Sequence, residues 1–191
     1  MGAWIEIPPD ETADADLKRK LDHVRAPNGT VDNVMRVHGL RAHTMIGHYS
    51  LYMSVLHNED NTLPGWLLET VASYTSMLND CAYSLANHWS NARHLIDDDK
   101  RADAIHAALQ ADTPELVFDG KELAFLRYAR KLTVQAHEMV HADVKELHKA
   151  GASDGEILEV NQVICYFNYV NRLLNGLGVS LEGDKVGFYS T

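Results

Sequence analysis

The sequence predicts an all-α protein, and three observations support this. Apolar residues recur at helical spacing along most of the chain, as in 119–137. Signals for helix ends bracket these runs: Ser153 with Glu156 three residues later forms a capping box. No stretch shows the alternation typical of a half-buried strand. We therefore expect a single domain over 1–191, with 1–40 as an N-terminal arm with short helices and 41–191 as the core.

The expected elements follow from capping and breaking residues. An extended start ends at Pro8 and Pro9, and turn clusters occupy 26–30 and 58–65. Helices are expected at 10–24, 31–38, 41–57, 64–78, 80–96, 99–110, 119–137, 142–149 and 153–174, with glycines at 39, 151 and 176 as helix ends. The helices near 64–78 and 80–96 are expected to pack as an antiparallel pair, because few residues separate them.

Composition narrows the class of partner. The formal net charge is −10, which argues against nucleic acid and against an anionic membrane surface. No apolar run is long enough to span a bilayer, and the first residues lack the basic and apolar regions of a signal peptide. We therefore expect a cytoplasmic protein whose two cysteines are reduced thiols.

The stretch 69–88 holds the candidate chemistry. Asn79 or Asp80 is a plausible N-cap for the helix that follows, which places Cys81 near a first turn where free N–H groups and the helix dipole favour a thiolate. Ser84 and His88 share a face with Cys81. At about 1.5 Å per residue, His88 stands roughly 10 Å from Cys81 along the axis, so a relay would pass through the Ser84 hydroxyl or a water.

Glu69 lies on the preceding helix and completes this candidate site. It stands about ten residues before the expected turn, and His88 about nine after it, so an antiparallel hairpin brings the two level. A carboxylate would then face an imidazole and a thiol, as expected of an activated cysteine. The alternative is structural: a lone cysteine is most often a small core residue, and a histidine on an apolar helix is often held by one hydrogen bond.

Glu69, Cys81 and His88 resemble the core motif of the carboxymuconolactone decarboxylase and alkylhydroperoxidase D family. That motif is a glutamate, a Cys-x-x-Cys beginning twelve residues later, and a histidine four after the second cysteine. The tail at 151–184 is similar to the end of the longer, peroxidase-related members. The resemblance implies an alkylhydroperoxidase D-like helical bundle, a homo-oligomer, and thiol-dependent reduction of a small organic hydroperoxide without a cofactor or metal.

The sequence departs from that motif at Ser84, which stands where the family has its second cysteine. The resemblance gives that cysteine the reactive role and makes the first cysteine its disulfide partner. Serine has no sulfenic-acid state, so Cys81 would have to react and an external thiol reductant would resolve it. Two rival functions stay open. One is a decarboxylase-like proton-transfer enzyme acting on a small organic acid through His88 and Glu69. The other is a catalytically degenerate, oligomeric binding protein.

Two further features of the sequence carry groups that could do chemistry. HEMVH at 137–141 matches the H-E-x-x-H zinc signature, but the signature needs one continuous helix and a helix break is expected within it. Cys165 lies in an apolar, aromatic segment, which indicates a buried and inert thiol. The other interpretation of Cys165 is that it approaches an oxidised Cys81 and resolves it.

Overall fold

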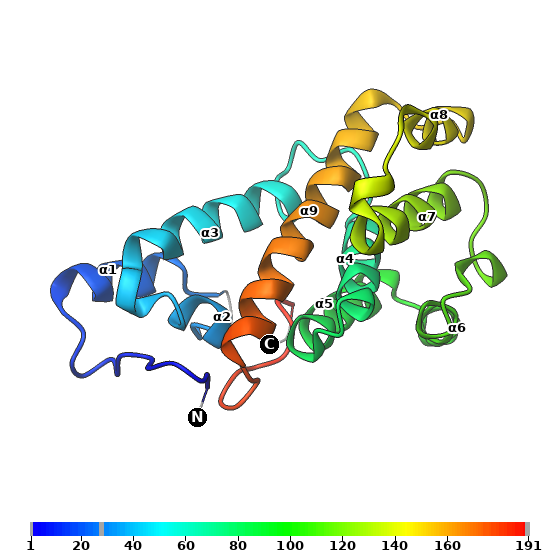
Figure 1. The fold of residues 1–191 in the computed structure, drawn as a ribbon. Helices are drawn as coiled ribbons and strands as arrows, with labels where there is room; N and C mark the ends of the chain where they lie inside the picture. Colours follow the sequence, from blue (N-terminus) through cyan, green and yellow to red (C-terminus); the bar gives the residue numbers. More distant parts are fainter. Residues whose placement is uncertain (1, 27–28, 190–191) are drawn as a thin grey trace.

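The structure, a computed structural model, describes residues 2–26 and 29–189 and is helical throughout, with no strand in those residues (Figure 1). This confirms the all-α prediction. The α-helices are α1 (Ala15–His23), α2 (Asn33–Arg36), α3 (Ala42–Leu56), α4 (Gly65–Leu78), α5 (Ala82–Ile96), α6 (Asp99–Gln110), α7 (Gly120–Val134), α8 (His141–Lys149) and α9 (Asp154–Leu177). Short 3₁₀ turns occupy Gly39–Arg41, Pro114–Leu116 and Ala136–Glu138.

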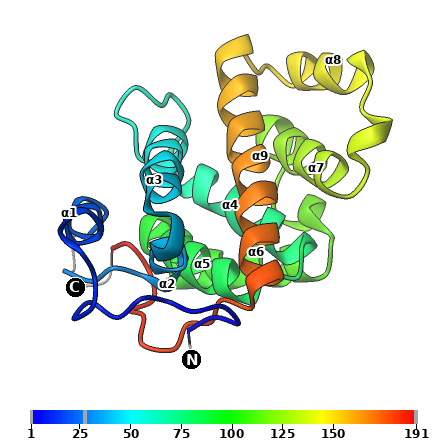
Figure 2. The same ribbon diagram turned by 60° about the vertical axis from the view of Figure 1, so that its left-hand side comes forward.

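Helix α4 is the centre of the main core. Ten consecutive residues of it, 67–76, are buried, so it is enclosed on nearly all sides. Helices α5, α7 and α9 surround it, and α9 runs through the middle of the molecule (Figures 1 and 2). The α4–α5 pair is antiparallel as expected. Ser76 and Ser84, which are close to the turn on either side, are in contact, and so are Glu69 and His88, which are farther from it.

The turn between α4 and α5 differs from the expected N-cap. Cys81, not Asn79 or Asp80, is the N-cap of α5. Asp80 has a left-handed backbone (φ 50°) and ends α4. The Asp80 N–H donates to Met77 O at 3.0 Å and the Cys81 N–H to Ser76 O at 2.9 Å, the pattern of a Schellman motif. Because Asp80 terminates one helix, the next helix begins at Ala82, two residues later than expected.

The N-terminal helices form a satellite core beside the main one. Leu17 and Leu21 of α1 pack with Met35 of α2 and Met45 of α3. The two ends of the chain run together: the Trp4 N–H donates to Leu177 O and the Ser180 N–H to Gly2 O (Figure 2). Beyond α9 the chain contacts α2 and α5, since the Asn33 N–H donates to Asp184 and the Phe188 N–H donates to Asn91.

Most expected boundaries hold within a few residues, and two details stand out. The predicted capping box at Ser153 and Glu156 is present. Helix α9 ends at Gly178, in the left-handed conformation, rather than at Gly176, so it is about one turn longer than expected. His137 lies in a 3₁₀ turn and His141 begins α8, which confirms the break within HEMVH. Within 2–26 and 29–189, no helix has the length and hydropathy needed to cross a membrane.

Candidate active site

A carboxylate–imidazole pair joins α4 to α5. Glu69 is only 2% exposed, and its Oε2 accepts a hydrogen bond from Nδ1 of His88 at 2.7 Å. The other oxygen, Oε1, accepts from Nδ2 of Asn91 at 3.1 Å. Because a carboxylate can only accept, Nδ1 of His88 carries a proton and Nε2 is the ring nitrogen left to exchange one. The predicted approach of Glu69 to His88 is therefore confirmed.

The His88 ring is held from several sides. Phe167 of α9 packs its ring edge-to-face against the imidazole, with centroids 4.5 Å apart. Asn91 is fixed in turn, since its Oδ1 accepts from the Phe188 N–H at 2.7 Å. Both Asn91 and Phe167 are buried, so the carboxylate bound to Asn91 and the ring of Phe167 hold the imidazole in one orientation.

Ser84 is buried one turn before His88 and is tied to α4. Its Oγ accepts from Oγ of Ser76 at 3.1 Å. Ser76 Oγ also lies 2.8 Å from the carbonyl of Ala72, a second acceptor for its proton. Asn171 of α9 donates to Ser76 at 3.3 Å.

Cys81 is placed differently from the other candidates. It is 1% exposed and belongs to the main hydrophobic core. Burial raises the pKa of the Cys81 thiol and outweighs the opposing effect of the Ser84 and Tyr83 backbone N–H groups. The expectation that the helix start would favour a thiolate at Cys81 is thus wrong in direction, because desolvation is the larger effect.

Cys165 also departs from its expected environment. It is exposed rather than buried, on the outer face of α9, and its Sγ contacts Asn161 Oδ1 at 3.6 Å. Partial burial still raises the pKa of this thiol. The apolar neighbours of Cys165 in sequence belong to the other faces of α9, as Ile164 and Phe167 are fully buried while Cys165 is not.

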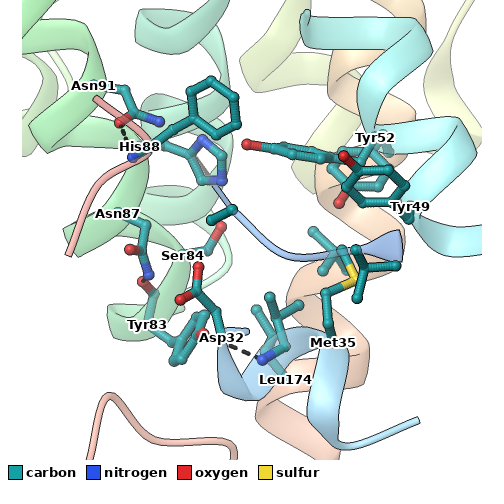
Figure 3. Close-up of a pocket in the computed structure, with 16 residues that line it drawn as sticks. Asp32, Met35, Tyr49, Tyr52, Tyr83, Ser84, Asn87, His88, Asn91 and Leu174 are labelled. Atoms are coloured by element: carbon teal, nitrogen blue, oxygen red, sulfur yellow. Dashed lines mark hydrogen bonds between the residues drawn. The ribbon is translucent and has the colours of Figure 1, made fainter. Parts of the chain in front are cut away.

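A pocket of about 80 Å³ opens beside the Glu69–His88 pair (Figure 3). We call it the tyrosine pocket. Its walls include Tyr49 and Tyr52 of α3, Tyr83, Ser84, Asn87, His88 and Asn91 of α5, Tyr166 and Val170 of α9, and Asp32, Met35 and Phe188. Figure 3 shows Tyr49 and Tyr52 approaching from one side and the α5 residues from the other. Ser84 and His88 thus face one cavity, whereas Cys81 is not among its lining residues.

A buried chain of hydrogen bonds leads to this pocket from the start of α3. Thr44 Oγ1 is 2.7 Å from His38 Nδ1, His38 Nε2 is 2.8 Å from His48 Nδ1, and His48 Nε2 is 2.8 Å from Tyr166 Oη. Burial lowers the pKa of both histidines, that of His48 to about 3, so both rings are neutral at pH 7.

The C-terminal segment closes one side of the tyrosine pocket. The Gly187 N–H donates to Oδ1 of Asn87 at 3.0 Å, next to the Phe188–Asn91 bond. The Phe188 ring stacks on His57, with centroids 4.3 Å apart, and His57 Nε2 is 2.8 Å from Tyr52 Oη. Phe188 therefore forms part of the wall, and the Gly187–Asn87 bond holds the segment beside it.

Sequence reasoning missed the far side of this pocket. Asn91 follows His88 by three residues and so shares its helix face, a signal that was available. Tyr52, Tyr166 and Asp32 come from distant parts of the chain and carry no local signature. The Tyr166 hydroxyl lies 2.8 Å from Nε2 of His48 beside the cavity.

Comparisons with known proteins agree on the fold. No protein-family model matches the chain, and no curated protein matches it in sequence. Solved structures do match. One is described as an alkylhydroperoxidase AhpD core, an uncharacterized peroxidase-related protein from Ralstonia eutropha JMP134, with a TM-score of 0.80 at 20% identity over 94% of this chain and 92% of that one.

Two further structures have the same fold. An uncharacterized peroxidase-related protein from Silicibacter sp. TM1040 has a TM-score of 0.80 at 21% identity, over 94% of this chain and 91% of that one. The debrominase Bmp8, solved in complex with 2,3,4-tribromopyrrole, has a TM-score of 0.71 at 14% identity, over 92% and 90%. The chain therefore has the AhpD-like fold that the sequence resemblance implied.

Proposed function

We propose that the chain is a peroxidase-related enzyme in which the Glu69–His88 pair moves a proton to or from a small molecule in the tyrosine pocket. One observation carries this proposal: His88 lines the cavity and is oriented by a buried carboxylate at 2.7 Å. A carboxylate that fixes the tautomer of an imidazole and stabilises its protonated form is the usual support of a general base.

The reaction proposed first is thiol-dependent reduction of a small organic hydroperoxide, with Cys81 as the thiol. The Cys81 thiolate attacks the O–O bond, the sulfur becomes a sulfenic acid, and the hydroperoxide leaves as an alcohol after gaining a proton through His88. An external thiol then forms a mixed disulfide with Cys81 and releases water, and a second thiol restores Cys81. A hydroperoxide is uncharged, which suits a wall that has no lysine or arginine among its described residues.

The structure sets a condition on this reaction. Cys81 is buried with a raised pKa, so little thiolate is present at neutral pH and the sulfur must be uncovered before it meets the substrate. We therefore expect slow turnover in the wild-type chain.

The same observation favours a second candidate, a proton-transfer enzyme that uses no thiol. In that function Glu69 and His88 act on a pocket ligand directly, and Cys81 is a core residue. The residues that line the cavity beside His88 include Ser84 but not Cys81, which is the arrangement this candidate requires.

Consumption of cumene hydroperoxide in the presence of a small thiol separates the two. The first candidate predicts turnover that Cys81→Ser abolishes and His88→Gln lowers, while Cys165→Ser leaves it unchanged. Cys165→Ser is the matched control, since Cys165 is the other thiol of the chain. Turnover that persists in Cys81→Ser, or no turnover in the folded wild-type chain, would contradict the thiol reaction and favour the second candidate.

A further inference from the structure

Tyr166 and Asp32 present hydrogen-bond acceptors to the tyrosine pocket. The buried chain of hydrogen bonds from Thr44 to Tyr166 determines the direction in which the Tyr166 hydroxyl donates its proton. Thr44 Oγ1 lies 2.9 Å from the carbonyl of Arg41, which can only accept, so the Thr44 proton goes there. His38 must then donate to Thr44, His48 to His38, and Tyr166 to His48, because each neutral ring has one N–H. The Tyr166 proton points away from the pocket and its lone pairs remain.

Ser84 adds a hydroxyl to the wall, and its Oγ lies 3.1 Å from Oγ of Ser76. The two amides of the wall are tied to the protein. Asn87 donates to Tyr83 O at 3.1 Å and accepts from Gly187, and Asn91 bridges Glu69 and Phe188. Both amide oxygens and one N–H of each amide are therefore used within the protein.

Asp32 adds a carboxylate to this wall (Figure 3). Burial raises the pKa of Asp32, and the neighbouring carboxylate of Asp184 raises it further. The nearby guanidinium of Arg36 is already paired with Asp10, and its Nε donates to Val31 O at 2.9 Å. Among the described lining residues there is no lysine or arginine, so Asp32 has no cationic partner inside the pocket.

Aromatic faces complete the surroundings. Tyr49, Tyr52, Tyr166 and Phe188 line the same cavity, and ring faces attract cations through their quadrupole. An anion would face the Asp32 carboxylate with no lysine or arginine among the described lining residues to compensate it, which is costly in a partly buried site.

We propose that the tyrosine pocket binds small organic ammonium compounds, with the nitrogen at Asp32 against the tyrosine rings and the rest of the ligand toward Ser84 and His88. This proposal rests on the proposed function in one respect: it names the class of substrate on which the Glu69–His88 pair would act in the same cavity. It argues against a carboxylate substrate and thus against the organic-acid form of the proton-transfer enzyme.

The test compares three probes of similar shape, benzylammonium, benzyl alcohol and benzoate, by calorimetric titration at pH 7 and low salt. We expect benzylammonium to bind at least about tenfold more tightly than benzoate, with benzyl alcohol between them. Shifts of the side-chain amide resonances of Asn87 and Asn91 should place the ligand in the cavity.

Variants make the assignment specific. Asp32→Asn should remove most of the advantage of benzylammonium and leave benzyl alcohol unchanged, whereas Asp60→Asn, at an exposed loop position, should alter neither. Tyr52→Leu should weaken the cation more than the alcohol, and it tests the aromatic wall without touching Asp32.

Benzoate binding as tightly as benzylammonium, no binding of benzylammonium, or an unchanged preference in folded Asp32→Asn would overturn the proposal. No hydroperoxide or thiol enters this assay, and Cys81→Ser should give the same preferences. A failure of ligand binding is therefore distinguishable from a failure of the thiol reaction.

Discussion

Replacing Ser84 with cysteine should create a redox pair beside the relay. Position 81 is the N-cap of α5 and position 84 lies on its first turn, the arrangement in which Cys-x-x-Cys disulfides form. Unlike Cys81, position 84 lines the tyrosine pocket. A thiol there stands four residues before His88, within reach of the imidazole. The new thiol would attack the hydroperoxide, and Cys81 would resolve it without leaving the core.

The expected gain in turnover follows from the hydrogen bond between the new thiolate and the His88 imidazole. A hydrogen bond to a charged group contributes about 1.5–3 kcal/mol, and each ~1.4 kcal/mol of barrier is tenfold in rate, so turnover should rise about 10- to 100-fold. The loss of the Ser84–Ser76 hydrogen bond should cost about 1 kcal/mol of stability, which a folded domain tolerates.

The assay is consumption of an organic hydroperoxide with a small dithiol as reductant. Ser54→Cys, which adds an exposed thiol on α3, is the matched control and should give no gain. Glu69→Gln in the Ser84→Cys background should lower the gain. If oxidised Ser84→Cys forms no 81–84 disulfide, the inferred geometry is wrong. If the disulfide forms and turnover stays at the wild-type level, the relay serves another chemistry.

Four further outcomes follow from the structure. Phe167→Ala removes a fully buried ring and should lower the free energy of unfolding by about 3–5 kcal/mol, measured by urea denaturation; a loss below about 1 kcal/mol would contradict its packing. The pKa of His48 is lowered to about 3, so the unfolded chain binds an extra proton below about pH 6.5. The free energy of unfolding should then decrease as the pH is lowered, by up to about 1.4 kcal/mol per pH unit between roughly pH 6 and pH 3. His48→Gln should flatten that slope, and an equal slope in the variant would refute the assignment. A thiol reagent should modify the exposed Cys165 quickly and the buried Cys81 much more slowly, and two fast thiols per chain would show that Cys81 is open. Light scattering at micromolar concentration should give the mass of a homo-oligomer, because α9 exposes Leu158 and Tyr169; a monomer mass would refute this.

The helices were predictable from sequence where local signals agree. The capping box at Ser153 and Glu156 fixed the start of α9, and spacing alone brought Glu69 level with His88. The turn at Asp80 was harder to place. Aspartate serves as an N-cap and also tolerates a left-handed backbone, and only the Schellman hydrogen bonds decide between these roles.

The tyrosine pocket could not be predicted, because its walls join segments far apart in the chain. Tyr52 and Tyr166 are 114 positions apart, and nothing local relates them. The pKa of Cys81 was mispredicted for a related reason: helix position is local, whereas desolvation depends on the core that encloses the thiol.

The central claim is that Cys81 reacts with a hydroperoxide under the control of the Glu69–His88 pair. Its most direct test is to add one equivalent of cumene hydroperoxide and to measure the rate at which dimedone traps a sulfenic acid on Cys81. Intact-protein and peptide mass spectrometry detect and locate the adduct. We predict a stoichiometric adduct on Cys81 that forms slowly in the wild-type chain. In His88→Gln it should form at least about tenfold more slowly, which corresponds to about 1.4 kcal/mol of activation free energy supplied by the Glu69–His88 pair. An adduct confined to Cys165, or a rate at Cys81 unchanged by His88→Gln, would contradict the claim.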